Sequence, residues 1–388
     1  MPSRDEDLKF HWFLPTSGDS RAIVGGGHGL QRGHGHPTAS AFRPPTIDYL
    51  GQIARSAEQL GFEAVLTPTG TWCEDAWLVT AALTQQTTRL KFLVAFRPGF
   101  VSPTLAAQMA ATYQRISGGR LLLNVVTGGE STEQRRFGDH LSKDERYART
   151  DEFLSIVRGA WSGTPYDFTG THYQVEGATV AETPDPVPEL YFGGSSAAAG
   201  TVAARHVQTY LTWGEPPAQV AEKVAWVRGL AAEQGRTLRF GIRLHVITRD
   251  TSEEAWAEAG RLLDAIDPAD VRTAQQTLGR SDSVGQKRML ALHEGYRRDG
   301  GSVHDLEVHP GLWAGVGLVR GGAGTALVGS HSEVADLIGE YADQGITEFV
   351  LSGYPHLEEA YWFGEGVLPE LRRRGVLGRT GEPVRLSA

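Results

Sequence analysis

The sequence has little of three things: cysteine, long hydrophobic runs and positive charge. Its single cysteine, Cys73, excludes an intrachain disulfide framework and any C-x-x-C zinc or redox motif. No stretch approaches the roughly 18 consecutive apolar residues of a membrane-spanning helix. The 37 basic residues are outnumbered by 46 acidic ones, which gives a formal charge of −9. That balance argues against nucleic acid or an anionic membrane surface as the main partner.

What is present is the composition of a globular protein. Hydrophobic residues make up 40% of the 388 residues, enough for a sizeable core, and 21% are charged. Residues 1–9 are polar and have no apolar core, unlike a signal peptide. A chain of this length suggests two or three domains, but β/α barrels are larger single units. We therefore expect a soluble, cytoplasmic α/β protein.

Short apolar runs alternate with helical patterns along most of the chain. Residues 46–60 carry apolar side chains at helical spacing, and Gly61 follows in the position of a C-terminal cap. Ser102 and Pro103 mark another helix start. The strands expected from these patterns are residues 10–14, 64–66, 89–95, 120–126, 190–192, 207–212, 239–247 and 348–351. The expected helices are residues 46–60, 74–85, 103–116, 143–161, 196–205, 217–234 and 281–295.

Eight strands that alternate with helices favour a parallel sheet, and eight is the number that closes a (β/α)8 TIM barrel. The doubly wound alternative normally shows a G-x-G-x-x-G turn after its first strand, and this sequence has none. We predict an α/β fold with one barrel domain over residues 9–370 and a C-terminal tail over 371–388. Insertions at about 17–45, at 165–188 (a hairpin) and at 265–330 are expected to form the walls and lid of an active site.

Polar residues at strand ends are the candidate site, because barrel active sites lie at the carboxyl ends of the strands. Asn124 ends the fourth strand, and the fifth ends in Gly194-Ser195-Ser196 before a helix. Hydroxyls and free N–H groups at a helix N-terminus suit a phosphate. An ordinary N-cap on a tight turn fits the same segment equally well.

Arg243 and His245 alternate with apolar neighbours, so both are expected to face the barrel interior. With Tyr354 after the eighth strand they would make a cationic pocket with proton-transfer groups. The alternative, which composition alone favours, is a buried ion pair at Arg243 and a satisfied core histidine at His245. The glycine-rich residues 319–325 lack the ending of a P-loop and suggest either a flexible lid that presents Arg320 or a plain loop.

Two other signals are weak. His28, His34 and His36 lie in a glycine-rich loop without paired structural ligands, so we expect a solvated loop and no metal site. Cys73 follows the second strand and could face the site. Since no basic helix surrounds it, an inert thiol fits better than a nucleophile.

Longer motifs resemble one known family. They are Phe13-Leu14-Pro15-Thr16, Cys73 to Trp77, YFGGSS at 191–196, YLTWGEPP at 210–217, FGIRLHVI at 240–247, LWAGVGLVRGGAGTALVG at 312–329 and LSGYPHLEEAY at 351–361. Together these segments resemble the FMNH2-dependent alkanesulfonate monooxygenases among the bacterial-luciferase-like flavin monooxygenases. The similarity extends from residue 9 to about residue 370.

The resemblance implies a barrel that takes reduced FMN from a separate NAD(P)H-dependent flavin reductase. Reaction with O2 gives a flavin peroxide that attacks an organosulfonate and releases sulfite and an aldehyde. It also implies a homodimer or homotetramer. The residues that match substrate-binding or proton-moving positions are Arg243, His245, Arg320, Tyr354 and His356. The flavin positions are Asn124, Tyr147, Gly194, Ser195 and Ser196, and the pocket positions are Trp213, Cys73 and Ser17.

The first loop departs from the family pattern. Ser17 stands where the family usually has His, and the loop that follows is longer. A smaller residue and a rebuilt loop would enlarge or repolarise the pocket, so the sugar sulfonate sulfoquinovose is an alternative to a linear alkanesulfonate. A related flavin monooxygenase acting on sulfones, amines or pyrimidine rings is another alternative. An inactive ligand-binding barrel is a third, against which the presence of Arg243, His245, Arg320 and Tyr354 speaks.

Overall fold

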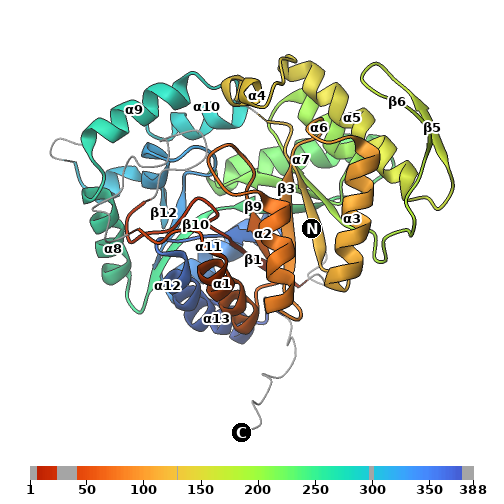
Figure 1. Cartoon of the computed structure of the whole chain (residues 1–388). Helices are drawn as coiled ribbons and strands as arrows, with labels where there is room; N and C mark the ends of the chain where they lie inside the picture. Colours follow the sequence, from red (N-terminus) through yellow and green to blue (C-terminus); the bar gives the residue numbers. More distant parts are fainter. Residues whose placement is uncertain (1–6, 24–41, 129, 297–300, 378–388) are drawn as a thin grey trace, which may run out of the picture.

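Eight parallel strands close a barrel, which confirms the predicted TIM-barrel fold (Figure 1). The computed structural model describes residues 7–23, 42–128, 130–296 and 301–377. In order around the barrel the strands are β1 (Lys9–Phe13), β14 (Glu348–Leu351), β9 (Arg239–Arg243), β8 (Thr209–Trp213), β7 (Leu190–Gly193), β4 (Leu121–Val125), β3 (Lys91–Phe96) and β2 (Ala64–Thr67).

Helices surround the barrel and are capped where the sequence indicates. Gly61 ends the first helix with φ of 91°, a left-handed conformation that glycine adopts without strain. The Ser102 hydroxyl accepts a hydrogen bond from the backbone N–H of Leu105 at the start of the third. The outer helices are α1 (Ile47–Leu60), α2 (Ala76–Leu83), α3 (Pro103–Ser117), α5 (Lys143–Ala160), α6 (Ala197–His206), α7 (Pro217–Glu233), α11 (His331–Asp343), α12 (His356–Tyr361) and α13 (Leu368–Arg373). The π-helical turn Trp362–Val367 joins the last two. None of the described helices is both long and apolar enough to cross a membrane.

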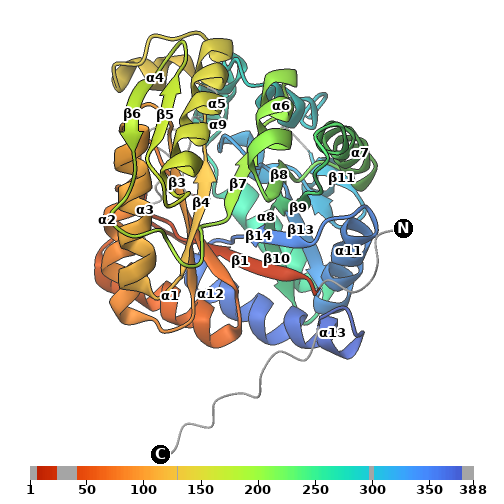
Figure 2. The ribbon, with the colours of Figure 1, turned by 90° about the vertical axis from the view of Figure 1, so that its right-hand side faces the viewer.

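The expected hairpin in residues 165–188 is present as β5 (Tyr166–Thr169) and β6 (Gln174–Ala178). Figure 2 shows it beside α5 on the outer surface. Its turn is fixed by Glu152 of α5, whose carboxylate accepts hydrogen bonds from the backbone N–H groups of Thr171, His172 and Tyr173. A short helix that the sequence analysis missed, α4 (Ser131–Arg136), lies between β4 and α5.

The expected single strand over residues 239–247 is wrong. The chain leaves the barrel after Arg243, which pairs with Val350 of β14, and His245 begins a strand of a second sheet. That sheet has the order β10 (His245–Arg249), β13 (Ala326–Ser330), β12 (Leu312–Trp313) and β11 (Glu307–His309). The break arises because β14 supplies a partner for the first half of the run and β13 for the second.

The third insertion contains more helix than the sequence patterns indicated. Residues 265–330 contain α9 (Pro268–Gly279) and α10 (Val284–Ala291), and α8 (Ser252–Asp264) directly precedes them. All three helices lie on the left side of Figure 1, opposite the β5–β6 hairpin in that view. Short 3-10 turns follow at 303–306 and 315–318. The start of α8 had a readable signal: Thr251 and Glu254 form a capping box.

The glycine-rich residues 319–325, expected to be either a flexible lid or a plain loop, form a loop between the 3-10 turn at 315–318 and β13. Val319, Arg320, Ala323 and Thr325 of this loop are buried. Arg320 thus projects from a packed wall. His28, His34 and His36 of the first insertion lie outside the described residues.

A buried polar network lies inside the amino-terminal end of the barrel, away from the strand ends that carry the candidate site. Glu348, fully buried at the start of β14, accepts hydrogen bonds from His11 Nε2 at 3.0 Å, Tyr191 Oη at 2.8 Å and Arg239 Nε at 3.0 Å. Burial would raise the pKa of Glu348, but the bond and charge interaction with His11 and the charge of Arg239 outweigh it and lower the pKa to about 2.

Candidate active site

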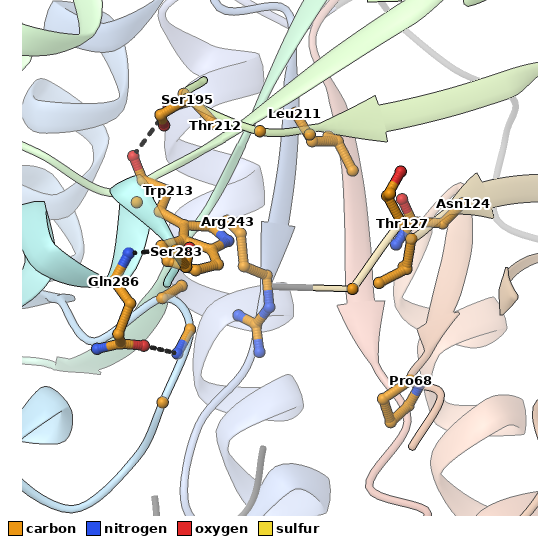
Figure 3. Close-up of a pocket in the computed structure, with 18 of the residues that line it drawn as sticks. Pro68, Asn124, Thr127, Ser195, Leu211, Thr212, Trp213, Arg243, Ser283 and Gln286 are labelled. Atoms are coloured by element: carbon orange, nitrogen blue, oxygen red, sulfur yellow. Dashed lines mark hydrogen bonds between the residues drawn. The ribbon is translucent and has the colours of Figure 1, made fainter. Parts of the chain in front are cut away.

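A cavity of about 310 Å³ opens at the carboxyl ends of the barrel strands, where a TIM barrel places its active site (Figure 3). The sequence-predicted residues that line it are Asn124, Tyr147, Gly194, Ser195, Trp213, Arg243 and Arg320. The predicted residues that do not line it are Ser17, Cys73, Ser196, His245, Tyr354 and His356. The predicted residues therefore fall into two groups, those that line the cavity and those that do not.

One wall is a glycine turn that leads into α6. A Cβ on Gly193 would lie 2.6 Å from the Leu211 carbonyl oxygen, and one on Gly194 would lie 2.6 Å from the Ala199 Cβ, so neither position admits a side chain. The Ser196 hydroxyl caps the helix by accepting from the Ala199 N–H. Burial raises the pKa of Tyr147, which faces this turn, and the adjacent Ser196 hydroxyl opposes that shift. The result is a narrow cradle of hydroxyls and first-turn amides.

A cationic wall lies on the β9 side of the cavity. Arg243 is half-buried and Arg320 is buried, and both guanidinium groups lie over the ring of Phe13, at 4.7 and 5.3 Å from its centroid. Among the described residues, neither guanidinium forms a salt bridge with a carboxylate. Burial and the positive charge of Arg320 lower the pKa of Arg243. An anion between the two arginines would relieve this repulsion.

His245 lies behind Arg243 and is tied to it through Ser352. The Arg243 Nη2–H donates to Ser352 Oγ at 2.9 Å, and Ser352 Oγ lies 2.7 Å from His245 Nδ1. Burial and then the charge of Arg243 lower the pKa of His245, so the ring is neutral. Its Nε2 is 3.2 Å from the Ala323 carbonyl, which can only accept, so we infer that Nε2 carries the proton and Nδ1 accepts from Ser352. His245 thereby holds both Arg243 and the segment that carries Arg320.

Tyr354 and His356 form a further layer. The Tyr354 ring stacks on His245 at 5.5 Å and meets His356 edge-on at 5.2 Å. Within the part of the chain that the structure describes, His356 Nε2 is buried without a hydrogen-bond partner, and the buried Tyr354 hydroxyl interacts with the Arg320 guanidinium. His356 Nδ1 is 2.9 Å from Asp19 Oδ1. The sequence patterns did not single out Asp19. The unpaired Nε2 of His356 and the Tyr354 hydroxyl beside Arg320 are therefore the candidate groups for a proton-transfer role.

The roof of the cavity comes from α10 and was missed by the sequence analysis. Gln286 is buried, and its Oε1 accepts a hydrogen bond from the Gly322 N–H at 3.0 Å, which ties α10 to the Arg320 segment (Figure 3). Trp213 closes the same side: a Cβ on Gly285 would lie 3.0 Å from its ring. Nothing in the local sequence marks Gln286, because it follows no barrel strand.

Cys73 and Ser17 lie outside the lining set. Cys73 is half-buried with its Sγ 3.6 Å from the Gly70 carbonyl oxygen, and burial raises the pKa of the thiol to about 12. A thiol that stays protonated is a poor nucleophile, in agreement with the inert alternative. Ser17 is buried in the loop after β1, so its size does not act on the cavity by direct lining.

The barrel, its insertions and this strand-end cavity define a TIM barrel with a ligand site at the usual end, and comparison with known families narrows the class. The chain belongs to the luciferase-like monooxygenase family, whose model matches residues 8–348. Solved structures share the fold. A riboflavin lyase (RcaE) solved with modified FMN and riboflavin has 22% identity and a TM-score of 0.78, covering 97% of this chain and 94% of that one. A long-chain alkane monooxygenase (LadA) has 20% identity, a TM-score of 0.77 and the same coverages of 97% and 94%. The EDTA monooxygenase (EmoA) from Chelativorans sp. BNC1 has 20% identity and a TM-score of 0.73, covering 96% of each chain.

The residues present fit a flavin phosphate. The Gly193-Gly194 turn is too tight for side chains, and the amides of Ala197 and Ala198 at the start of α6 have no intrahelical partner. With Ser195, Ser196 and Tyr147 beside them, these groups offer N–H and O–H donors and no acidic residue in the first helical turn.

Proposed function

We propose that this chain is an FMNH2- and O2-dependent monooxygenase that cleaves the C–S bond of an organosulfonate and releases sulfite and an aldehyde. Reduced FMN would come from a separate NAD(P)H-dependent flavin reductase. One oxygen atom of O2 enters the organic product and the other leaves as water. Membership of the luciferase-like family supports the reaction class.

One observation supports an organosulfonate as the substrate. Arg243 and Arg320 face one cavity over the same aromatic ring, and no described carboxylate neutralises either guanidinium. Two like charges in one cavity, one half-buried and one buried, are costly unless a ligand brings the opposite charge. A sulfonate is a permanent anion whose three oxygens can accept from both guanidinium groups, and Arg is suited to such recognition.

The remaining residues hold and close this site. Ser352 and His245 fix the Arg243 guanidinium, and Phe13 provides an apolar floor beside the anion. Tyr354 and His356 lie behind the arginines. The unpaired Nε2 of His356 is suited to accept the proton that leaves the substrate carbon, and the Tyr354 hydroxyl lies beside Arg320. The contact between Gln286 and Gly322 keeps the roof over the cavity and limits entry of water.

The cradle would hold the FMN phosphate. Ser195, Ser196 and Tyr147 would donate to its oxygens together with the first amides of α6, and Asn124 lies along the same wall. When bound, reduced flavin supplies the electrons with which O2 is activated.

Sulfite release is the direct test. The purified protein would be supplied with FMN, NAD(P)H and a flavin reductase and given methanesulfonate, octanesulfonate or sulfoquinovose. We expect sulfite from at least one of them. Sulfite from the linear chains alone would favour an ordinary alkanesulfonate enzyme, and sulfite from the sugar alone would favour the sulfoquinovose alternative. Absence of sulfite with every sulfonate, from protein that binds FMN, would overturn the substrate class and leave the family standing.

A further inference from the structure

Arg97 forms a second cationic wall, directly across the barrel mouth from Arg243. Arg243 is the last residue of β9 and Arg97 follows β3. Three strands separate β9 from β3 in either direction around the eight-stranded barrel: β8, β7 and β4 on one side, and β14, β1 and β2 on the other. Arg97 lines the same cavity and is only 4% exposed.

One of the three nitrogens of the Arg97 guanidinium is hydrogen-bonded. Its Nη2 donates to Glu133 Oε2 at 2.6 Å and to the Thr69 carbonyl at 3.5 Å. In residues 7–23, 42–128, 130–296 and 301–377, its Nε and Nη1 have no hydrogen-bond partner. The Arg97 Cζ lies 5.8 Å from the ring centroid of Phe100 and 5.5 Å from that of Phe137, so both rings pack against the guanidinium. A buried guanidinium with two of its three nitrogens unpaired requires an acceptor.

Two neighbours are unpaired in the same way. Trp72 lines the cavity, and its buried Nε1–H has no partner among the described residues. Gln134 is 1% exposed, and neither atom of its amide is hydrogen-bonded in the described chain. It lies against the cavity wall, since a Cβ on the lining residue Gly128 would be 2.0 Å from Gln134 Nε2.

The wall at Arg97 differs in charge from the wall at Arg243, because Arg97 has a carboxylate partner. Glu133 already neutralises Arg97 through a buried salt bridge at 2.6 Å, so a full anion gains little here. The unused groups are N–H donors from Arg97 and Trp72 plus an amide of Gln134 that can donate and accept. They suit a flat, uncharged edge of carbonyl oxygens and one N–H.

We infer that Arg97, Trp72 and Gln134 form the subsite for the pyrimidine-dione edge of the flavin ring. The inference rests on the proposed function. FMN has two polar ends, a phosphate and a dione, and the sulfonate is a third polar group. The cavity offers three polar walls, at the cradle after β7, at Arg243 and Arg320, and at Arg97. With the phosphate in the cradle and the sulfonate at the two unneutralised arginines, the dione is the group that matches the third wall.

Flavin binding, measured without turnover, tests the assignment. FMN and riboflavin would be titrated by fluorescence quenching into wild type, Trp72→Phe and the double variant Arg97→Gln with Glu133→Gln, which removes the salt bridge without leaving a buried charge. Ser196→Ala is the contrast at the cradle, and Arg115→Gln, an exposed arginine, is the control. Circular dichroism would confirm that each variant is folded.

We expect Trp72→Phe and the double variant each to lower the affinity for both flavins by roughly tenfold, because both ligands carry the dione. Ser196→Ala should lower the affinity for FMN and leave the affinity for riboflavin unchanged. Unchanged flavin affinity in both the Trp72→Phe and the double variant would overturn the inference, as would a rise in the KM for the sulfonate with no change in flavin affinity. If wild type binds neither flavin, the proposed function fails as well, and the two failures are thereby distinguished.

Discussion

The carboxylate of Asp19 holds His356 through two hydrogen bonds. Its Oδ2 accepts from the His356 backbone N–H at 2.8 Å, and its Oδ1 is 2.9 Å from His356 Nδ1. Tyr49 Oη donates to the same carboxylate at 2.6 Å. Burial would raise the pKa of Asp19, but its interactions with His356 and Tyr49 outweigh burial and lower it. An ionised carboxylate can only accept, so Nδ1 carries the proton and the free lone pair of a neutral His356 is on Nε2.

Asp19→Asn should therefore impair proton transfer more than substrate binding. An amide can donate to Nδ1 and reverse the tautomer, which places the proton on the atom that should accept it. We expect kcat to fall by about tenfold or more with little change in KM. The pH profile of kcat and the ¹⁵N chemical shifts of His356 would be compared with those of Tyr49→Phe, which removes a neutral donor from Asp19. Wild-type kcat together with a wild-type tautomer in Asp19→Asn would contradict the assignment.

Gln286→Ala should loosen the roof of the cavity. The variant removes the acceptor that holds the Gly322 N–H and should let water reach the site. We expect a larger share of the O2 consumed to appear as hydrogen peroxide and a smaller share as sulfite. The matched control is Lys287→Ala, the exposed neighbour on the same helix. Equal coupling in the two variants would show that this contact does not protect the reaction.

Glu348→Gln should reduce stability in a pH-dependent way. The folded pKa of about 2 lies below the 4.5 of an unperturbed glutamate, so ionised Glu348 stabilises the folded protein above pH 4.5. That contribution, on the order of 3 kcal/mol, is lost as the pH falls from 4.5 towards 2. Urea unfolding of wild type and Glu348→Gln should show a large difference in the free energy of unfolding at pH 7 and a smaller one near pH 3. A difference that does not shrink at low pH would exclude this linkage.

The barrel was predictable because its signals are local. Helix periodicity, the cap at Gly61 and the Ser102–Pro103 start are all encoded within a few residues. The second sheet was not predictable, because nothing in the sequence near Leu244 marks the break between β9 and β10. The break is set by β13, which lies far along the chain and pairs with His245.

The residues of the candidate site also divide into those that local sequence signals mark and those that they do not. Arg243 was found because it alternates with apolar neighbours, and Asn124 and Ser195 were found because they lie at the ends of expected strands. Arg97 obeys the same rule, since it follows the expected strand at 89–95, and that signal was overlooked. Gln286 could not be found, because it reaches the cavity from an insertion helix through the tertiary packing of α10.

The central claim is that Arg243 and Arg320 select an anionic substrate, and one comparison tests it most directly. Aldehyde formation would be measured side by side for the sulfonate that releases sulfite fastest and for its uncharged methyl sulfone, with wild type and with Arg320→Gln. We predict turnover of the sulfonate alone by wild type and a loss of about tenfold or more in kcat/KM in the variant. Equal turnover of the sulfone, or a variant as active as wild type, would contradict the account.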